Sequence, residues 1–210
     1  MPKLEPYYVD FSSDSEYLVI AINCHNSLAD RYEWEDTFLD WDEFDFKKLY
    51  LFDRYSSWFG KQSGGISGWA KTVARYVKKS KAKYVIVIGA SMGGYGALVI
   101  GSLINADCVL AFVPQTKPTK RWPDVPINCR KILEKRQDNK TVFNIYFGKD
   151  NRDDVEQAKN LFGIDNINFR PVKSDQHKIT KDLVRNGIVK KAMRRVLQGN
   201  FNYILSEKKK

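Results

Sequence analysis

Residues 85–98 read VIVIGASMGGYGAL, and this stretch decides how the rest of the chain is interpreted. A β-branched apolar run predicts a buried strand, Gly-x-Ser-x-Gly follows it, and small residues then begin a helix. The layout predicts a sharp turn that exposes the hydroxyl of Ser91, with Gly89 and Gly93 leaving room where the backbone is crowded. We expect a strained Ser91, at about 1–3 kcal/mol. Because the turn lies above the amino end of the helix, it favours developing negative charge, and it is a candidate nucleophile elbow.

The length and the termini point to one globular unit. With 210 residues the chain can bury a single core. We expect one domain over residues 1–205 and a disordered basic tail over 206–210. No run of apolar residues is long enough for a transmembrane helix, and the first residues lack the apolar core of a secretory signal. These features favour a cytoplasmic protein.

The three cysteines, Cys24, Cys108 and Cys129, form no Cys-x-x-Cys pair, and the chain has only two histidines. A structural zinc site is therefore not expected. Cys24 and Cys108 lie in or beside apolar runs, so we predict that they are buried thiols. We expect neither a metal nor an organic cofactor.

The net charge of +10 comes from basic residues that are spread over many segments. No signature of a nucleic-acid-binding module accompanies them. A solvated basic surface is the favoured interpretation. The alternative is attraction to an anionic polymer, an anionic glycolipid or a membrane face.

Apolar runs alternate with helical patterns along the whole chain. The predicted strands are Tyr7–Phe11, Tyr17–Asn23, Lys48–Phe52, Lys83–Ile88, Cys108–Val113, Thr141–Phe147 and Ile167–Val172. The predicted helices are Trp69–Lys79, Met92–Leu103, Asn128–Arg136, Asp153–Phe162, Ile179–Arg185 and Ile188–Leu197. Such alternation predicts an α/β fold: a mostly parallel sheet of about six to seven strands flanked by helices, with an antiparallel edge at the amino end and no large lid. The structure of 30–46, rich in acids and aromatics, is not predicted.

A serine nucleophile needs a base to take its proton and an acid to orient that base. After a nucleophile elbow the chain order is Ser, then Asp or Glu, then His. His177 follows a predicted strand downstream and is the candidate base. Asp150, directly after the strand that ends at Phe147, is the first choice for the acid, with Asp153 as the alternative. Asp154 ranks last, because capping the next helix accounts for it.

An oxyanion hole needs two N–H donors. One is the backbone of Met92, the residue after the candidate nucleophile. The other should come from the loop after the Tyr17–Asn23 strand, where His25 is the first choice and Cys24 the next.

The elbow, the Ser–Asp–His order and the strand alternation resemble the α/β-hydrolase superfamily over nearly the whole chain. A closer likeness is to small bacterial hydrolase-like domains found with glycosyltransferases and polysaccharide-biosynthesis proteins. It rests on Gly89–Ala97, on AFVPQT at residues 111–116 and on the segment from Asp53 to Phe59. From these segments we take Trp58, Tyr95 and Gln115 as candidate substrate-binding residues. The chain departs from many α/β-hydrolases at Asn23-Cys24, where His-Gly is frequent.

The resemblance implies a serine hydrolase that cleaves an ester or thioester through an acyl-enzyme. An acyltransferase in glycan or polysaccharide modification would use the same residues, with a sugar hydroxyl in place of water. A third possibility is a non-catalytic hydrolase-like binding module. The expected substrate is small and acylated or glycan-linked. Segments 30–46, 55–68 and 115–127 are candidate covers of the site.

Overall fold

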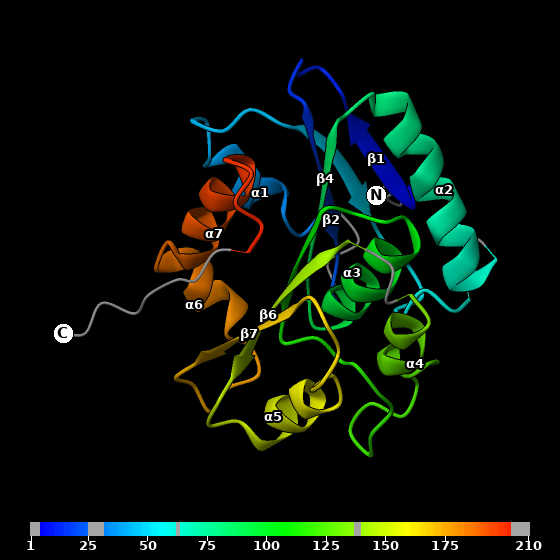
Figure 1. Ribbon diagram of the computed structural model, residues 1–210, viewed down its shortest axis with the longest axis vertical. Coiled ribbons are helices and arrows are strands. Elements are labelled where there is room, and N and C mark those ends of the chain that lie inside the picture. The colour runs from blue at the N-terminus through cyan, green and yellow to red at the C-terminus, as the bar shows by residue number, and fades with distance from the viewer. Residues whose placement is uncertain (1–4, 25–31, 62–63, 137–139, 203–210) are drawn as a thin grey trace.

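A computed structural model describes residues 5–24, 32–61, 64–136 and 140–202 (Figure 1). Within them one seven-stranded sheet runs in the order β1-β3-β2-β4-β5-β6-β7. The strands are β1 (Tyr7–Asp10), β2 (Tyr17–Ile22), β3 (Lys47–Leu51), β4 (Tyr84–Ala90), β5 (Cys108–Phe112), β6 (Val142–Gly148) and β7 (Ile167–Val172). β1 pairs antiparallel with β3, and every other pairing is parallel. This confirms the predicted sheet, including its antiparallel edge.

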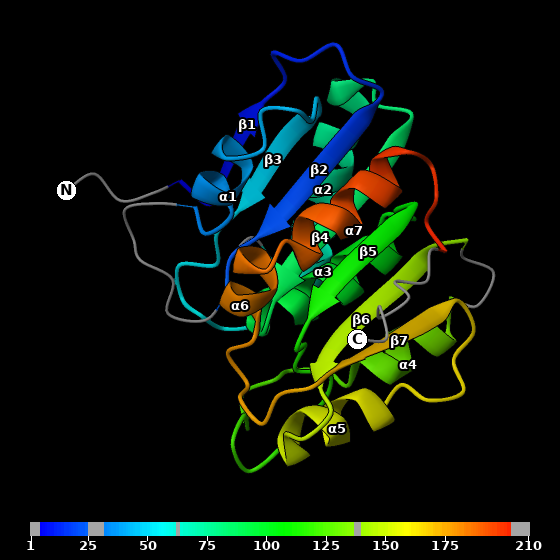
Figure 2. The ribbon, with the colours of Figure 1, turned by 90° about the vertical axis from the view of Figure 1, so that its left-hand side faces the viewer.

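Helices cover both faces of the sheet (Figure 2). The helices α2 (Gly65–Ser80), α3 (Met92–Leu103), α4 (Cys129–Glu134) and α5 (Arg152–Lys159) lie on one side. On the other side lie α1 (Glu35–Leu39), α6 (Thr180–Arg185) and α7 (Ile188–Leu197). Parallel strands need such crossovers, and the helices bury both faces of the central strands.

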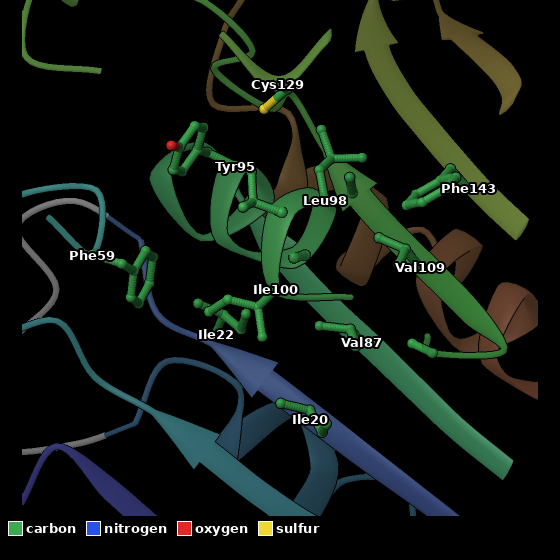
Figure 3. Packing of buried hydrophobic residues seen from close by; sticks show 14 of the residues in the cluster. Ile20, Ile22, Phe59, Val87, Tyr95, Leu98, Ile100, Val109, Cys129 and Phe143 are labelled. Atoms are coloured by element: carbon green, nitrogen blue, oxygen red, sulfur yellow. The ribbon is translucent and has the colours of Figure 1, made fainter. Parts of the chain in front are cut away.

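The central strands divide the core into two halves by simple alternation. Leu18, Ile20 and Ile22 of β2 face α2 and α3, whereas Val19 and Ala21 face the opposite cluster. Figure 3 shows the first half, in which apolar side chains of β2, β4 and β5 pack against α3. The helix α3 is buried along nearly its whole length, because it crosses the middle of the sheet. This burial fixes its first turn relative to the end of β4.

The described part of segment 30–46, residues 32–46, contributes α1 and a cluster of rings. Phe38 packs edge-on against Phe46, with ring centroids 5.3 Å apart, and against Trp41 at 5.5 Å. Trp34 is buried beside them and donates its indole N–H to the carbonyl of Ile22 at 3.2 Å. The segment therefore completes the core beside β2 and β3. The proposed tail, 206–210, lies outside the described residues.

Candidate active site

The turn after β4 has the predicted strained geometry. Ser91 sits between β4 and α3 with φ 52° and ψ −114°, outside the regions that residues other than glycine favour. A Cβ on Gly89 would lie 2.2 Å from the carbonyl oxygen of Gly93, and a Cβ on Gly93 would lie 2.5 Å from that of Ile22. Backbone atoms cannot move aside, so both positions require glycine. The strand, the two glycines and the helix together hold Ser91 at the carboxyl edge of the sheet.

The hydroxyl of Ser91 meets His177, which is 86 residues further along the chain. Ser91 Oγ lies 3.1 Å from His177 Nε2, as expected for the candidate base. His177 stands in the loop between β7 and α6. The ring of Trp122 packs on the imidazole with centroids 4.9 Å apart. Loop 115–127 thus covers one side of the histidine.

Asp154 contacts His177, and this corrects the predicted acid. Its Oδ1 lies 2.6 Å from His177 Nδ1, and its side chain is only 1% exposed. Because a carboxylate can only accept, Nδ1 carries the proton and leaves Nε2 free to accept the proton of Ser91. Asp150 is exposed, and Asp153 forms an exposed ion pair with Arg121 at 2.8 Å.

The reason for the error lies in the cap of α5. Asn151, not an aspartate, accepts the N–H of Asp154 at 3.0 Å and caps the helix. The helix therefore begins at Arg152, one residue before Asp153, and its first turn holds the buried side chain of Asp154. Among the described residues, the second oxygen of Asp154 has no hydrogen-bond partner.

Gln115 is the second side chain that contacts the Ser91 hydroxyl, besides His177. Its Nε2 donates to Ser91 Oγ at 3.0 Å, and its Oε1 accepts from the indole N–H of Trp58 at 2.7 Å. Gln115 is 2% exposed and Trp58 is 4% exposed. Of the three substrate-binding candidates, Gln115 therefore contacts the nucleophile directly, and Trp58 is linked to it through Gln115. Nothing in the sequence indicated that link.

Tyr95, the third candidate, does not face the site. It is fully buried on α3 within the hydrophobic core cluster that also contains Cys129 (Figure 3). Burial raises the pKa of its phenol. Its backbone N–H donates to the carbonyl of Ser91 at 3.1 Å. Tyr95 therefore stabilises the first turn of α3 and is wrong as a substrate contact.

Of the predicted oxyanion donors, Met92 is the first residue of α3, and N–H groups of a first helical turn have no acceptor within the helix. His25 lies outside the described residues. The N–H of Cys24, the alternative, donates to the carboxylate of Glu33 at 2.6 Å. Glu33 in turn donates its N–H to the Asn23 side chain at 3.2 Å. The carboxylate of Glu33 therefore competes with any oxyanion for the Cys24 amide.

Each of four neighbouring strands supplies one residue to this cluster. Ser91 follows β4, Gln115 follows β5, Asp154 follows β6 and His177 follows β7. All four residues therefore lie at one edge of the sheet, although the hydrogen-bond chain joins them in the order Gln115, Ser91, His177, Asp154. Carboxyl ends of parallel strands commonly hold the functional groups of open α/β sheets.

Two properties of the chain bear on its environment. Cys108 and Cys129 are buried free thiols, whereas Cys24 is half-buried, so the predicted burial is confirmed for Cys108 and only partial for Cys24. Among the described residues, no helix is both long and apolar enough to span a membrane.

Comparison with known proteins gives structural likeness without sequence likeness. No protein-family profile and no curated protein sequence matches the chain. The capsule O-acetyltransferase of Neisseria meningitidis serogroup A aligns with a TM-score of 0.67 at 15% identity, over 91% of this chain and 90% of that one. A structure from work on carboxylesterases of the thaumarchaeon Nitrososphaera gargenis aligns with a TM-score of 0.66 at 9% identity, over 92% and 94%.

The chain has the α/β-hydrolase fold. The strand order, the elbow and these alignments agree on it. A third match is the glycosylation-associated protein complex Gap123 of Streptococcus agalactiae, with a TM-score of 0.61 at 13% identity, over 94% of this chain and 45% of that one. In another structure the capsule acetyltransferase was solved with CoA. At identities this low, the structural alignments establish the fold alone. The reaction is therefore argued from the geometry of the site.

Proposed function

We propose that the protein is a serine acyl hydrolase that cleaves an ester or thioester through an acyl-enzyme on Ser91. The observation that carries the proposal is the continuous hydrogen-bond chain from Ser91 through His177 to the buried Asp154. A strained serine, a correctly protonated histidine and a buried carboxylate are the parts that acyl transfer requires. The fold supports the proposal, since its solved relatives include carboxylesterases and an acetyltransferase.

In the proposed reaction, Ser91 Oγ attacks the carbonyl carbon while its proton passes to His177 Nε2. The negative charge of Asp154 stabilises the imidazolium that forms. The tetrahedral oxyanion accepts the N–H of Met92. As the intermediate collapses, His177 gives its proton to the departing alcohol or thiol. Water then attacks the acyl-enzyme, with His177 taking the proton of the water and returning it to Ser91.

A second candidate is an acyltransferase that uses the same residues. The alignment with the capsule O-acetyltransferase over nearly the whole of both chains favours it. A sugar hydroxyl would replace water, so the substrate would be an acyl donor and a glycan. The basic residues of loop 115–127, Lys117, Lys120 and Arg121, would attract an anionic donor, polymer or glycolipid. Three free thiols fit a reducing compartment, and we propose the cytoplasm.

Labelling with a fluorophosphonate tests the proposal. Wild type should be labelled, whereas Ser91→Ala and His177→Ala should not be. Product analysis with acetyl esters and acetyl-CoA, with and without glycan acceptors, then separates hydrolase from transferase. A folded wild-type protein that resists labelling would refute both enzymes and leave a non-catalytic binding module.

A further inference from the structure

Ser91 is held from two sides, by His177 and by Gln115, and only His177 takes part in the proposed reaction. Its Oγ accepts a hydrogen bond from Gln115 Nε2 at 3.0 Å while it faces His177 Nε2 at 3.1 Å. Since Gln115 Nε2 can only donate, the hydroxyl proton of Ser91 is directed to the histidine. Gln115 thus selects the rotamer of the hydroxyl in the resting site.

The orientation of the Gln115 amide is fixed by Trp58. An indole N–H can only donate, so the Gln115 atom 2.7 Å from Trp58 Nε1 must be the oxygen. The nitrogen then points at Ser91. Both side chains are almost completely buried, so water does not compete for these bonds. In a flipped amide, the Gln115 NH₂ group would face the indole N–H of Trp58, so that two donors meet. The Gln115 oxygen would then face Ser91 Oγ, whose single proton is already directed to His177.

The loop that carries Trp58 is itself built around a buried carboxylate. Asp53, 2% exposed, accepts the N–H groups of Tyr55 at 3.1 Å, Ser57 at 2.8 Å and Phe59 at 2.8 Å. Trp58 and Phe59 have φ values of 51° and 64°, which residues with side chains rarely adopt. The carboxylate therefore stabilises an unfavourable backbone conformation. That conformation directs the Trp58 indole N–H to Gln115.

The segment that carries Gln115 is held with similar strain. Val113 has φ 42°, an outlier for a β-branched residue, and its N–H donates to the carbonyl of Tyr146 at 2.7 Å. Thr116 is tied to Gln157 through its N–H at 2.6 Å and its hydroxyl at 2.7 Å. Strained backbone of this kind persists where the surroundings over-determine it, and it concentrates at functional sites.

We propose that Gln115 is a catalytic residue that speeds the release of the acyl group from Ser91, and that Trp58 is its positioning residue. The proposal rests on the acyl-enzyme of the proposed function. A hydroxyl oxygen accepts a hydrogen bond well, and an ester oxygen accepts one poorly. When Oγ becomes the ester oxygen, the buried N–H of Gln115 loses its partner, which destabilises the acyl-enzyme.

The bond returns as the acyl group leaves. In deacylation, water or an acceptor hydroxyl adds to the acyl carbon, and the bond from that carbon to Oγ then breaks. The electron pair goes to Oγ, which takes a proton from His177 and regains the donor of Gln115. Acylation begins with this hydrogen bond already made, so its transition state gains less from Gln115. Gln115 therefore acts on deacylation more than on acylation.

Pre-steady-state hydrolysis of p-nitrophenyl acetate tests this difference. Gln115→Leu, which removes the donor and keeps most of the volume, should slow deacylation roughly tenfold, as expected for one buried hydrogen bond. Acylation, and labelling by a fluorophosphonate, should stay within about threefold. The variant should show a burst of nitrophenol larger than that of wild type, and the acetyl-enzyme should appear as a mass increase on the intact protein.

Trp58→Phe is the matched variant, because it keeps an aromatic ring and removes the indole N–H that fixes the orientation of the Gln115 amide. It should slow deacylation in the same sense, and the double variant with Gln115→Leu should be no slower than Gln115→Leu alone. Additive losses would mean that Trp58 acts through packing and would overturn its role. If Gln115→Leu does not fold, Trp58→Phe alone decides, through the ratio of the two rates.

Equal losses of acylation and deacylation in Gln115→Leu, or no loss, would refute the role of Gln115 and leave the proposed function intact. A wild-type protein that no fluorophosphonate labels would refute the proposed function and this inference together. The two failures are therefore distinguishable in one set of measurements.

Discussion

Replacing Asp154 by asparagine should nearly abolish acyl transfer while changing the shape of the site very little. Asparagine is almost isosteric with aspartate, so the packing around the buried side chain is kept. The amide, however, brings a donor to a position where the structure has an acceptor 2.6 Å from His177 Nδ1. If the amide nitrogen faces the ring, the imidazole proton moves to Nε2, which then cannot accept the proton of Ser91.

Two contributions set the magnitude. Loss of a charge-assisted hydrogen bond removes about 1.5–3 kcal/mol of support for the imidazolium, or roughly 10- to 150-fold in rate. Loss of the correct tautomer removes general-base catalysis, which contributes about 10²–10⁴-fold. Because both act on the same proton transfer, they overlap, and we expect kcat/KM to fall by about 10³–10⁴-fold.

Ester hydrolysis and the rate of fluorophosphonate labelling provide the assay, with thermal unfolding as the check on the fold. Asp150→Asn and Asp153→Asn are matched controls, since Asp150 is exposed, the Asp153 side chain is 47% exposed, and His177 pairs with Asp154 instead; each should change the rate less than twofold. The reasoning is refuted if Asp154→Asn keeps more than a tenth of the wild-type rate, or if Asp150→Asn loses as much.

Three further predictions concern the elbow, the thiols and the cover of the site. Gly93→Ala forces a Cβ to within 2.5 Å of a carbonyl oxygen and should destabilise the fold by about 1–3 kcal/mol or more, seen as a lower Tm and lost labelling; an unchanged Tm would contradict it. Burial raises the pKa of Cys108 to about 12 from 9.0, and the pKa of Cys129 also rises. Only the unfolded chain then loses these protons near pH 9, so the free energy of unfolding should fall above that pH, by up to about 1.4 kcal/mol per pH unit per thiol. Urea unfolding at pH 8, 9 and 10 measures this, and a flat profile would disprove it. Trp122→Ala removes a ring packed on His177 and should lower kcat/KM roughly 2- to 10-fold, as expected for about 0.5–1.5 kcal/mol of aromatic contact. Trp122→Phe keeps an aromatic ring and should retain most of the wild-type kcat/KM.

The parts of the fold that sequence reasoning predicted are those with a local cause. The helix after the elbow begins at Met92 and ends at Leu103, as its small and apolar residues indicated, and β7 ends at Val172 as predicted. Ser91 and His177 lie in hydrogen-bond distance because both follow strands of one parallel sheet. The chain order of the elbow motif supplied that expectation without any knowledge of distance.

The parts that were missed depend on contacts between distant segments or on a shift of a few residues. Asp154 was rejected as a helix cap, and a cap three residues earlier, at Asn151, turned it toward His177. Trp58 and Gln115 are 57 residues apart, and their contact depends on strained loops that no local pattern encodes. The aromatic segment before β3 lacks a clear period, because its rings pack on one another.

The order of the site residues across the sheet also determines how the protein would lose activity. His177 follows β7, which is partly buried along its length and, within the residues that the structure describes, is an edge strand paired with β6 alone. Ser91 follows β4, which lies between β2 and β5 and is buried from Val85 to Ala90. Local opening of an edge needs less free energy than global unfolding. Fraying of β7 would therefore withdraw the base while the nucleophile stays in place, so that the fraction of active molecules reports the stability of one strand rather than that of the whole domain.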